Sequence, residues 1–129
     1  DLDALAAYIE SLAPLSSPTP VDDAVARGEL RFHELGCPSC HPAPDYTDSD
    51  GTLRDVGTLT EASGQRRGEA LSGLDTPTLR GVWATAPYLH DGSAPTLEDV
   101  LQRDTAGLHG PVLSDTDAAD VAAFLRSLE

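Results

Sequence analysis

The first amphipathic pattern lies at the start of the chain. Its apolar residues follow 3, 4, 3 spacing and are Leu2, Leu5, Ile9 and Leu12. This spacing places them on one face of a helix, because residues three and four apart share a side. The segment that follows, PLSSPTP from Pro14 to Pro20, cannot continue a helix. Residues 14–23 are therefore predicted to be a semi-rigid linker.

A second amphipathic pattern precedes the two cysteines. Its apolar face is formed by Val25, Gly28, Phe32 and Leu35. Asp22 or Asp23 is suited to cap the start of this helix, and Gly36 is suited to end it. The pattern predicts a helix that leads directly into Cys37. His33 falls beside Phe32 and away from the apolar face, so it is expected to be solvated.

The rest of the chain predicts short elements and one further long helix. Pro, Asp, Ser and Gly dominate residues 38–57, which indicates a loop, and residues 60–72 are weakly helical. Prolines exclude a long helix from residues 76–95. Residues 96–102 form a short helix capped by Thr96. The last helix begins at Ser114, with Asp117 as its capping-box partner, and ends at Leu128.

The two ends of the chain resemble each other. Aligned without a gap, DLDALAAYIESL (residues 1–12) and DAADVAAFLRSL (117–128) share Asp, Ala, Ala, Ser and Leu. Helices rich in Ala and Leu also resemble one another by chance. The sharper hypothesis is a tandem architecture, in which residues 1–13 close a preceding domain that is absent here.

Charge and hydropathy limit the classes of partner. The chain of 129 residues has 22 acidic and 8 basic residues, a net charge of -14. Nucleic acids and anionic lipids would repel it, so a redox partner with a basic or neutral docking surface is expected. We expect no membrane span, because no run of 18 apolar residues occurs. The acidic start, DLDALAAYIE, does not resemble a signal peptide, which suggests a mature form or an excised fragment.

The motif CPSCH, residues 37–41, contains both cysteines of the chain. Two thiols three residues apart on a tight turn can each add to a vinyl group of one porphyrin, and His41 then faces the iron. A structural zinc site would need further Cys or His pairs at short spacing. A thioredoxin-like pair would need a preceding strand, whereas a helix precedes this one. The motif therefore predicts one haem c, attached through Cys37 and Cys40. With aromatic residues at 5%, a rigid cofactor would also supply apolar volume.

Three longer segments carry a family resemblance. They are GCPSCHPAPDYTDSDGTLRDVGT, DTPTLRGVWATAPYLHDGSAPTLEDVL and LSDTDAADVAAFLRSL. Together they resemble the C-terminal haem domain of the bacterial di-haem cytochrome c peroxidase superfamily, over residues 24–128 and in the expected order. The resemblance also implies a preceding haem domain.

The resemblance implies a fold as well. We expect an all-α, class I cytochrome c-like domain over residues 24–129, wrapped around one covalent haem. In that fold the helix before the haem motif crosses the final helix. Gly28 would permit close approach of the two helices, and Phe32 and Phe124 would pack at the crossing.

The second axial ligand of the iron is the open question, because the chain contains no methionine. In the resembled family this ligand, commonly Met, lies fourteen residues after the His of His-Asp-Gly, and counting from His90 reaches Asp104, a poor ligand. His109 lies between Gly107 and Gly110, and such a loop can approach a porphyrin closely. We favour His109, with His90 or an open sixth position as alternatives. His90 is otherwise expected to form hydrogen bonds near the haem edge.

Two further side chains are candidates for the haem propionates. Arg80 and Trp83 carry donors that could neutralise and hydrogen-bond these carboxylates. The alternatives are that Arg80 pairs with an acidic side chain and that Trp83 belongs to the core.

The sequence supports two functional hypotheses. The first is a monohaem electron-transfer domain cut from a larger multi-domain protein. The second is the electron-relay half of a peroxidase-like enzyme, or, with an open sixth position, a peroxide-reactive haem. Covalent haem attachment occurs outside the cytoplasm, so a bacterial periplasm or cell surface is the expected location.

Overall fold

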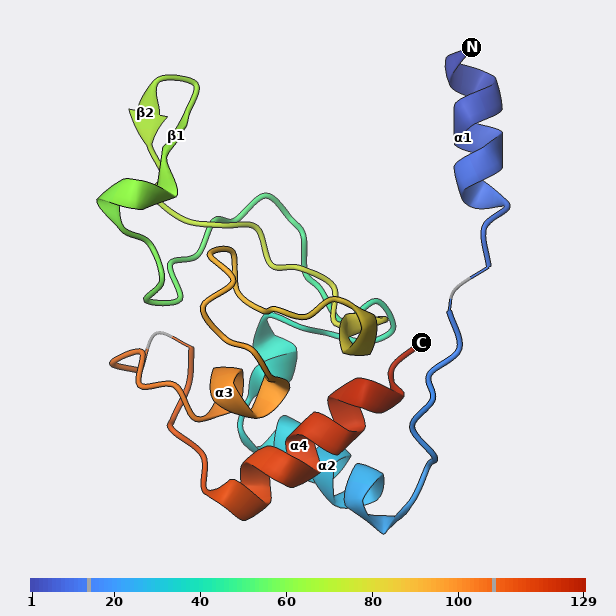
Figure 1. Ribbon diagram of the computed structural model, residues 1–129, viewed down its shortest axis with the longest axis vertical. Helices are drawn as coiled ribbons and strands as arrows, with labels where there is room; N and C mark the ends of the chain where they lie inside the picture. The colour runs from blue at the N-terminus through green and yellow to red at the C-terminus, as the bar shows by residue number, and fades with distance from the viewer. Residues whose placement is uncertain (14, 108) are drawn as a thin grey trace.

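The computed structural model describes residues 1–13, 15–107 and 109–129. Pro14 of the predicted linker and Leu108 lie outside the described residues. Within them the α-helices are α1 (Leu2–Glu10), α2 (Asp23–Glu34), α3 (Leu97–Leu101) and α4 (Asp115–Ser127) (Figure 1). Short 3-10 turns are η1 (Cys37–Ser39), η2 (Glu61–Ser63) and η3 (Val82–Ala84). Two strands, β1 (Gln65–Arg66) and β2 (Glu69–Ala70), form an antiparallel hairpin.

The crossing of α2 and α4 organises the fold. At Gly28 the two helices come so close that a Cβ atom would lie 1.9 Å from the carbonyl oxygen of Asp120. Arg27, beside it, donates two hydrogen bonds of 2.8 Å to the Asp120 carboxylate. The predicted close approach at Gly28 is confirmed, and a side chain at this position would force the helices apart.

An aromatic cluster made of Phe32, Tyr46 and Phe124 fills the crossing. The ring centroids of Phe32 and Phe124 lie 5.3 Å apart, as the sequence predicted for this pair. Tyr46, from the loop after the haem motif, adds edge contacts of 6.2 Å and 6.1 Å to the two rings. The loop that follows the cysteines is therefore fixed to the core. The other buried members of this core are Val25, Leu97, Leu113, Ala118, Val121, Ala122, Leu125 and Leu128.

The predicted helix starts are confirmed by their caps. Asp22 accepts hydrogen bonds from the amides of residues 24 and 25, so it caps α2. Thr96 and Asp99 form a reciprocal capping box at α3. Ser114 accepts the amide hydrogen of Asp117 at the start of α4. Each cap satisfies an amide that has no partner within its own helix.

The segment of residues 60–72 differs from its prediction. Only η2 is helical there, and residues 65–70 form the β1–β2 hairpin. Arg67 and Gly68, the two turn residues, have φ of 56° and 87°, which is the geometry of a two-residue hairpin turn. The fold is cytochrome c-like and mainly helical, and this hairpin adds a small amount of strand to the predicted all-α architecture.

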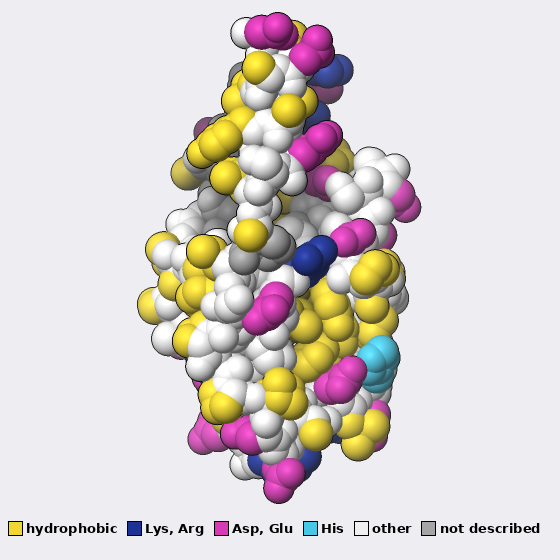
Figure 2. Space-filling view, turned by 90° about the vertical axis from the view of Figure 1, so that its right-hand side faces the viewer, with side chains coloured by type: hydrophobic (Ala, Val, Ile, Leu, Met, Phe, Trp, Pro, Cys, Tyr) yellow, Lys and Arg dark blue, Asp and Glu magenta, His cyan; other side chains and the backbone are white. Residues whose placement is uncertain are grey.

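Helix α1 stands apart from the rest of the molecule (Figure 1). None of its residues is buried, and its largest apolar side chains remain between 53% and 81% exposed. Figure 2 shows hydrophobic side chains along the arm that projects at the top of the molecule. The predicted helix is confirmed, but it ends at Glu10, so Leu12 lies just beyond it. Across the described residues, no helix is long and apolar enough to cross a membrane.

Candidate haem-binding site

The haem motif lies on a tight turn directly after α2. Gly36 ends the helix in the left-handed conformation (φ 76°), and η1 begins at Cys37. The amides of Cys40 and His41 both donate to the Cys37 carbonyl, at 3.2 Å and 3.0 Å. In a 3-10 turn residues three apart eclipse one another. Cys37 and Cys40, which are free thiols, lie three residues apart at the start and the end of this turn, which is the spacing that two bonds to one porphyrin require.

His41 is held by one hydrogen bond in the orientation of a metal ligand. Its Nδ1 lies 3.0 Å from the carbonyl oxygen of Tyr46. A carbonyl only accepts, so Nδ1 carries the proton and the lone pair is on Nε2. Burial is the main cause that lowers the pKa of His41, which favours the neutral imidazole. A neutral imidazole oriented through its other nitrogen is the usual form of a protein metal ligand.

The Tyr46 carbonyl is itself fixed by residues 76–79. It accepts a second hydrogen bond from the Leu79 amide, at 3.2 Å. On either side of Tyr46, the Thr78 hydroxyl donates to the Asp45 carbonyl and the Thr47 hydroxyl donates to the Thr76 carbonyl. Sequence reasoning assigned these threonines no role. Their only signal was their place in the Tyr-Thr-Asp and Thr-Pro-x-Leu-Arg motifs.

His109 lies on the loop between α3 and α4. Its amide donates to the Thr105 hydroxyl at 2.9 Å, and Gly107 and Gly110 have φ of 81° and 95°. The residue is exposed, yet partial burial of its ring and, secondarily, the charge of His41 lower its pKa. The assignment of His109 as the distal ligand stays a prediction.

His90 is engaged elsewhere. Its Nδ1 lies 2.9 Å from the Thr58 hydroxyl, and its Nε2 lies 3.0 Å from the Ser63 hydroxyl. With both ring nitrogens hydrogen-bonded, His90 has the partners expected for a hydrogen-bonding role. Asp104, at the position where the family commonly has Met, is exposed and accepts the Ala106 amide hydrogen at 2.9 Å. It serves the turn that leads to His109.

Trp83 provides a direct test of whether the site fits a haem. Its indole Nε1 is buried, and no hydrogen-bond acceptor reaches it among the described residues. A buried donor without a partner is costly, by about 1–3 kcal/mol. A haem propionate would supply the missing acceptor, so this residue fits the cofactor that the cysteines imply.

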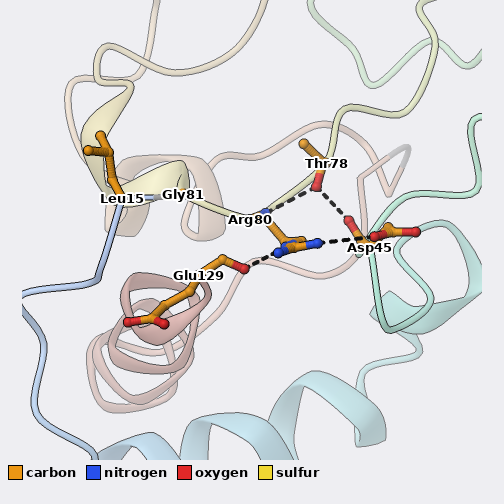
Figure 3. A pocket seen from close by; sticks show the side chains of 6 residues that line it. All are labelled: Leu15, Asp45, Thr78, Arg80, Gly81 and Glu129. Carbon is orange, nitrogen blue, oxygen red and sulfur yellow. Dashed lines mark hydrogen bonds and ion pairs between the residues drawn. The ribbon is translucent and has the colours of Figure 1, made fainter. Parts of the chain in front are cut away.

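Arg80 is already paired within the protein. Its Nε donates to the Glu129 carbonyl, and its Nη1 donates to the Asp45 carboxylate at 3.2 Å. Figure 3 shows its side chain between these two residues, in a cavity of about 520 Å³ that Leu15 of the linker also lines. The geometry therefore matches the alternative in which Arg80 pairs with an acid. A role toward a propionate stays a prediction.

The described residues give no support for a zinc site. Within residues 1–13, 15–107 and 109–129, no three His, Cys, Asp or Glu side chains are grouped so that they could hold a metal ion. His33 is exposed on α2, as predicted. The two thiols and the imidazole of the CPSCH motif fit a haem c, and this assignment is a proposal.

Comparisons with known proteins point to the same chemistry. A family model described as a RoxA-like, cytochrome c-like domain matches residues 73–106. Cytochrome c peroxidase Ccp of Escherichia coli strain K12 is 28% identical over 116 residues, 79% of this chain and 24% of that protein. The chain belongs to the di-haem cytochrome c peroxidase superfamily. A second member, methylamine utilization protein MauG of Methylophilus methylotrophus, is 26% identical over 130 residues, 84% of this chain and 38% of that protein.

Solved structures share the fold. A hydrazine synthase of Kuenenia stuttgartiensis superposes with a TM-score of 0.78 and 28% identity, over 98% of this chain and 55% of that chain. A MauG-like protein associated with microbial copper homeostasis gives 0.65 and 22% identity, over 84% and 47% of the two chains. The chain thus spans about a quarter to two fifths of these curated relatives and about half of the solved chains.

Proposed function

We propose that this chain is an electron-transfer domain with one haem c attached through Cys37 and Cys40. His41 is the proximal ligand and His109 the distal ligand. The hydrogen bond between His41 Nδ1 and the Tyr46 carbonyl carries the proposal. It fixes the tautomer and the ring orientation that an axial ligand needs, directly after a turn that carries the two thiols.

The residues of this chain would hold the haem and set its properties. When bound, the haem supplies a one-electron couple. A second imidazole in place of the usual Met lowers the potential of a c-type haem, and burial and hydrogen bonds offset part of that change. With both imidazoles bound to the iron, His41 and His109 would leave no open position for peroxide, and the site would serve electron transfer alone.

The correspondence between α1 and α4 supports a tandem domain architecture. In the alignment of residues 1–12 with residues 117–128, five α1-segment residues fall on buried positions of the α4 segment. These residues are Leu2, Leu5, Tyr8, Ile9 and Leu12, opposite Ala118, Val121, Phe124, Leu125 and Leu128. The apolar side of α1 thus has the pattern of a closing helix. Residues 24–129 form the haem domain, and residues 1–13 close a preceding unit.

The location and the partner follow from the cofactor and the charge. Covalent haem attachment by the usual machinery occurs outside the cytoplasm, so we place the protein in a bacterial periplasm or at the cell surface. With a net charge of -14, the domain attracts a basic redox partner and repels an acidic one.

An enzymatic role is the second candidate. The relative named as a cytochrome c peroxidase favours it, and so does the α1 pattern, because a preceding unit could hold a second haem. The domain would then relay electrons to chemistry in that unit. A second C-x-x-C-H upstream in the same gene supports this alternative, whereas another kind of upstream domain supports a simple carrier.

The haem and its distal ligand are tested together by absorption and electron paramagnetic resonance spectroscopy. The purified chain is expected to show a c-type α band on reduction and a low-spin ferric signal. His109→Ala is expected to convert the ferric haem to high spin, because an axial imidazole is lost.

The matched controls are His33→Ala, on the exposed face of α2, and His90→Ala, and both are expected to stay low-spin. A reduced spectrum without the α band contradicts the haem assignment. An unchanged low-spin signal in His109→Ala removes that residue as the ligand.

A further inference from the structure

The linker contacts the haem domain at Ser17. The Ser17 amide donates to the Glu129 carboxylate at 3.1 Å, and its hydroxyl donates to the Arg126 carbonyl. The same hydroxyl oxygen accepts the Thr19 amide hydrogen at 3.0 Å. Ser17 is half-buried, whereas Ser16 and Pro18 on either side are exposed. A linker that only tethered two units would not need the two hydrogen bonds that join Ser17 to the domain.

The contact completes the end of α4. The last carbonyl groups of a helix have no partner within the helix and need donors from elsewhere. Here the Arg126 carbonyl, in the last turn of α4, accepts a hydrogen bond from the Ser17 hydroxyl. The carbonyls of Leu128 and Glu129, which follow the helix, accept from the Gly81 amide at 3.0 Å and from the Arg80 guanidinium. The linker and residues 80–81 therefore meet at the same helix end (Figure 3).

Glu129 joins these contacts to the haem side of the domain. Its carboxylate binds the linker through Ser17, and its carbonyl binds Arg80. Arg80 also pairs with Asp45, which is next to the residue that orients His41. The linker is thus attached to the part of the domain that carries the proximal ligand.

We propose that Ser17 is a positioning residue that clamps the linker onto the haem domain, and so fixes where the preceding unit lies relative to the haem. This inference rests on the tandem architecture proposed above. Twelve free residues, 11–22, would reach about 40 Å when extended, at 3.3–3.6 Å per residue. With Ser17 docked, residues 11–16 reach about 20 Å. The clamp halves the reach of the tether and holds the two units at short range.

Limited proteolysis of the full holo-chain tests the clamp. The rate of cleavage within residues 11–22 by a protease of broad specificity is compared with that of a free peptide of the same sequence. The wild-type linker is expected to be cleaved far more slowly than the peptide. Ser17→Ala is expected to be cleaved about fivefold faster than wild type, because a lost hydrogen bond changes the docked population by about this factor.

Matched variants separate the clamp from general effects. Ser16→Ala changes an exposed neighbour and is expected to match wild type, and Ser17→Thr keeps the hydroxyl and is expected to stay protected. Equal rates for Ser17→Ala and Ser16→Ala overturn the inference, as does a wild-type linker cleaved as fast as the peptide.

The outcome is separate from that of the haem test. A chain with a c-type spectrum and an unprotected linker overturns the clamp alone. A protected linker in a chain without the α band overturns the haem assignment alone.

Discussion

At the scale of single residues, the contact that orients His41 comes from a residue outside the CPSCH motif. Cys37, Cys40 and His41 are adjacent in sequence, so their chemistry can be inferred from spacing. The acceptor that orients His41 is a backbone carbonyl, at Tyr46, placed by hydrogen bonds from residues 76–79. Because every residue has a backbone carbonyl, the identity of residue 46 does not indicate that its carbonyl orients His41. The hydroxyl partners of His90 are hidden for the same reason, because the fold alone brings Thr58 and Ser63 to it.

The proposed hydrogen bond between Trp83 and a haem propionate can be tested by measuring the midpoint potential. Trp83→Phe removes the buried indole donor and keeps an aromatic ring. A donor beside a propionate stabilises the more negative, reduced haem, so its loss is expected to lower the midpoint potential. The shift is on the order of tens of millivolts, since a hydrogen bond of about 1 kcal/mol corresponds to that range for one electron.

A redox titration of the holo-chain measures this shift. Tyr8→Phe, on the exposed helix α1, removes a polar group far from the core and is the control with no expected change. If the two variants have the same potential, Trp83 does not contact the haem.

At the scale of elements, the sequence predicted best where a local signal exists. The starts of α2, α3 and α4 are marked by side chains that cap their own backbone, so the interaction is contained in a few residues. The β1–β2 hairpin was missed because its six residues are exposed and carry no apolar alternation. Gly68 after Arg67 was the available turn signal. Helix α1 was predicted correctly, but its lack of packing could be seen only in the structure.

The contrast between α1 and α4 gives a matched pair of substitutions. Leu5 and Val121 occupy corresponding positions of the repeat, and they are 53% and 0% exposed. Val121→Ala is expected to lower the free energy of unfolding by about 2 kcal/mol, because it leaves a cavity in the core. Leu5→Ala is expected to change it by less than about 0.5 kcal/mol.

Denaturant titration of both variants, followed through the haem absorption, gives the comparison. A large loss of stability in Leu5→Ala would mean that α1 already packs within this chain. The apolar side of α1 would then no longer indicate a missing unit.

At the scale of the whole molecule, the net charge and the position of the linker determine which partners the domain can bind and where they lie. The acidic excess is a property of composition and was evident from the sequence. Helix α1 stands apart, and the linker that follows it passes the end of α4 (Figure 1). There Ser17 hydrogen-bonds to Arg126 and Glu129, which lie more than a hundred positions away in the sequence. Periodicity carries no information about such distant pairs.

The net charge predicts how electron transfer responds to salt. With a small basic cytochrome c as partner, the second-order rate is expected to fall about tenfold between 10 and 200 mM salt, because ions screen the attraction. With an acidic partner the rate is expected to rise. Stopped-flow mixing measures both, and a basic partner that is insensitive to salt would show that the acidic surface does not guide docking.

The Phe32, Tyr46 and Phe124 cluster has a practical consequence. The ring of Tyr46 rests on the helix crossing, while its carbonyl holds His41. Any loosening of α2 against α4 would therefore reach His41, the proposed axial ligand, through Tyr46. The absorption spectrum of the bound haem would then report on the packing of the core, so damage to the protein interior would be visible in a simple optical measurement.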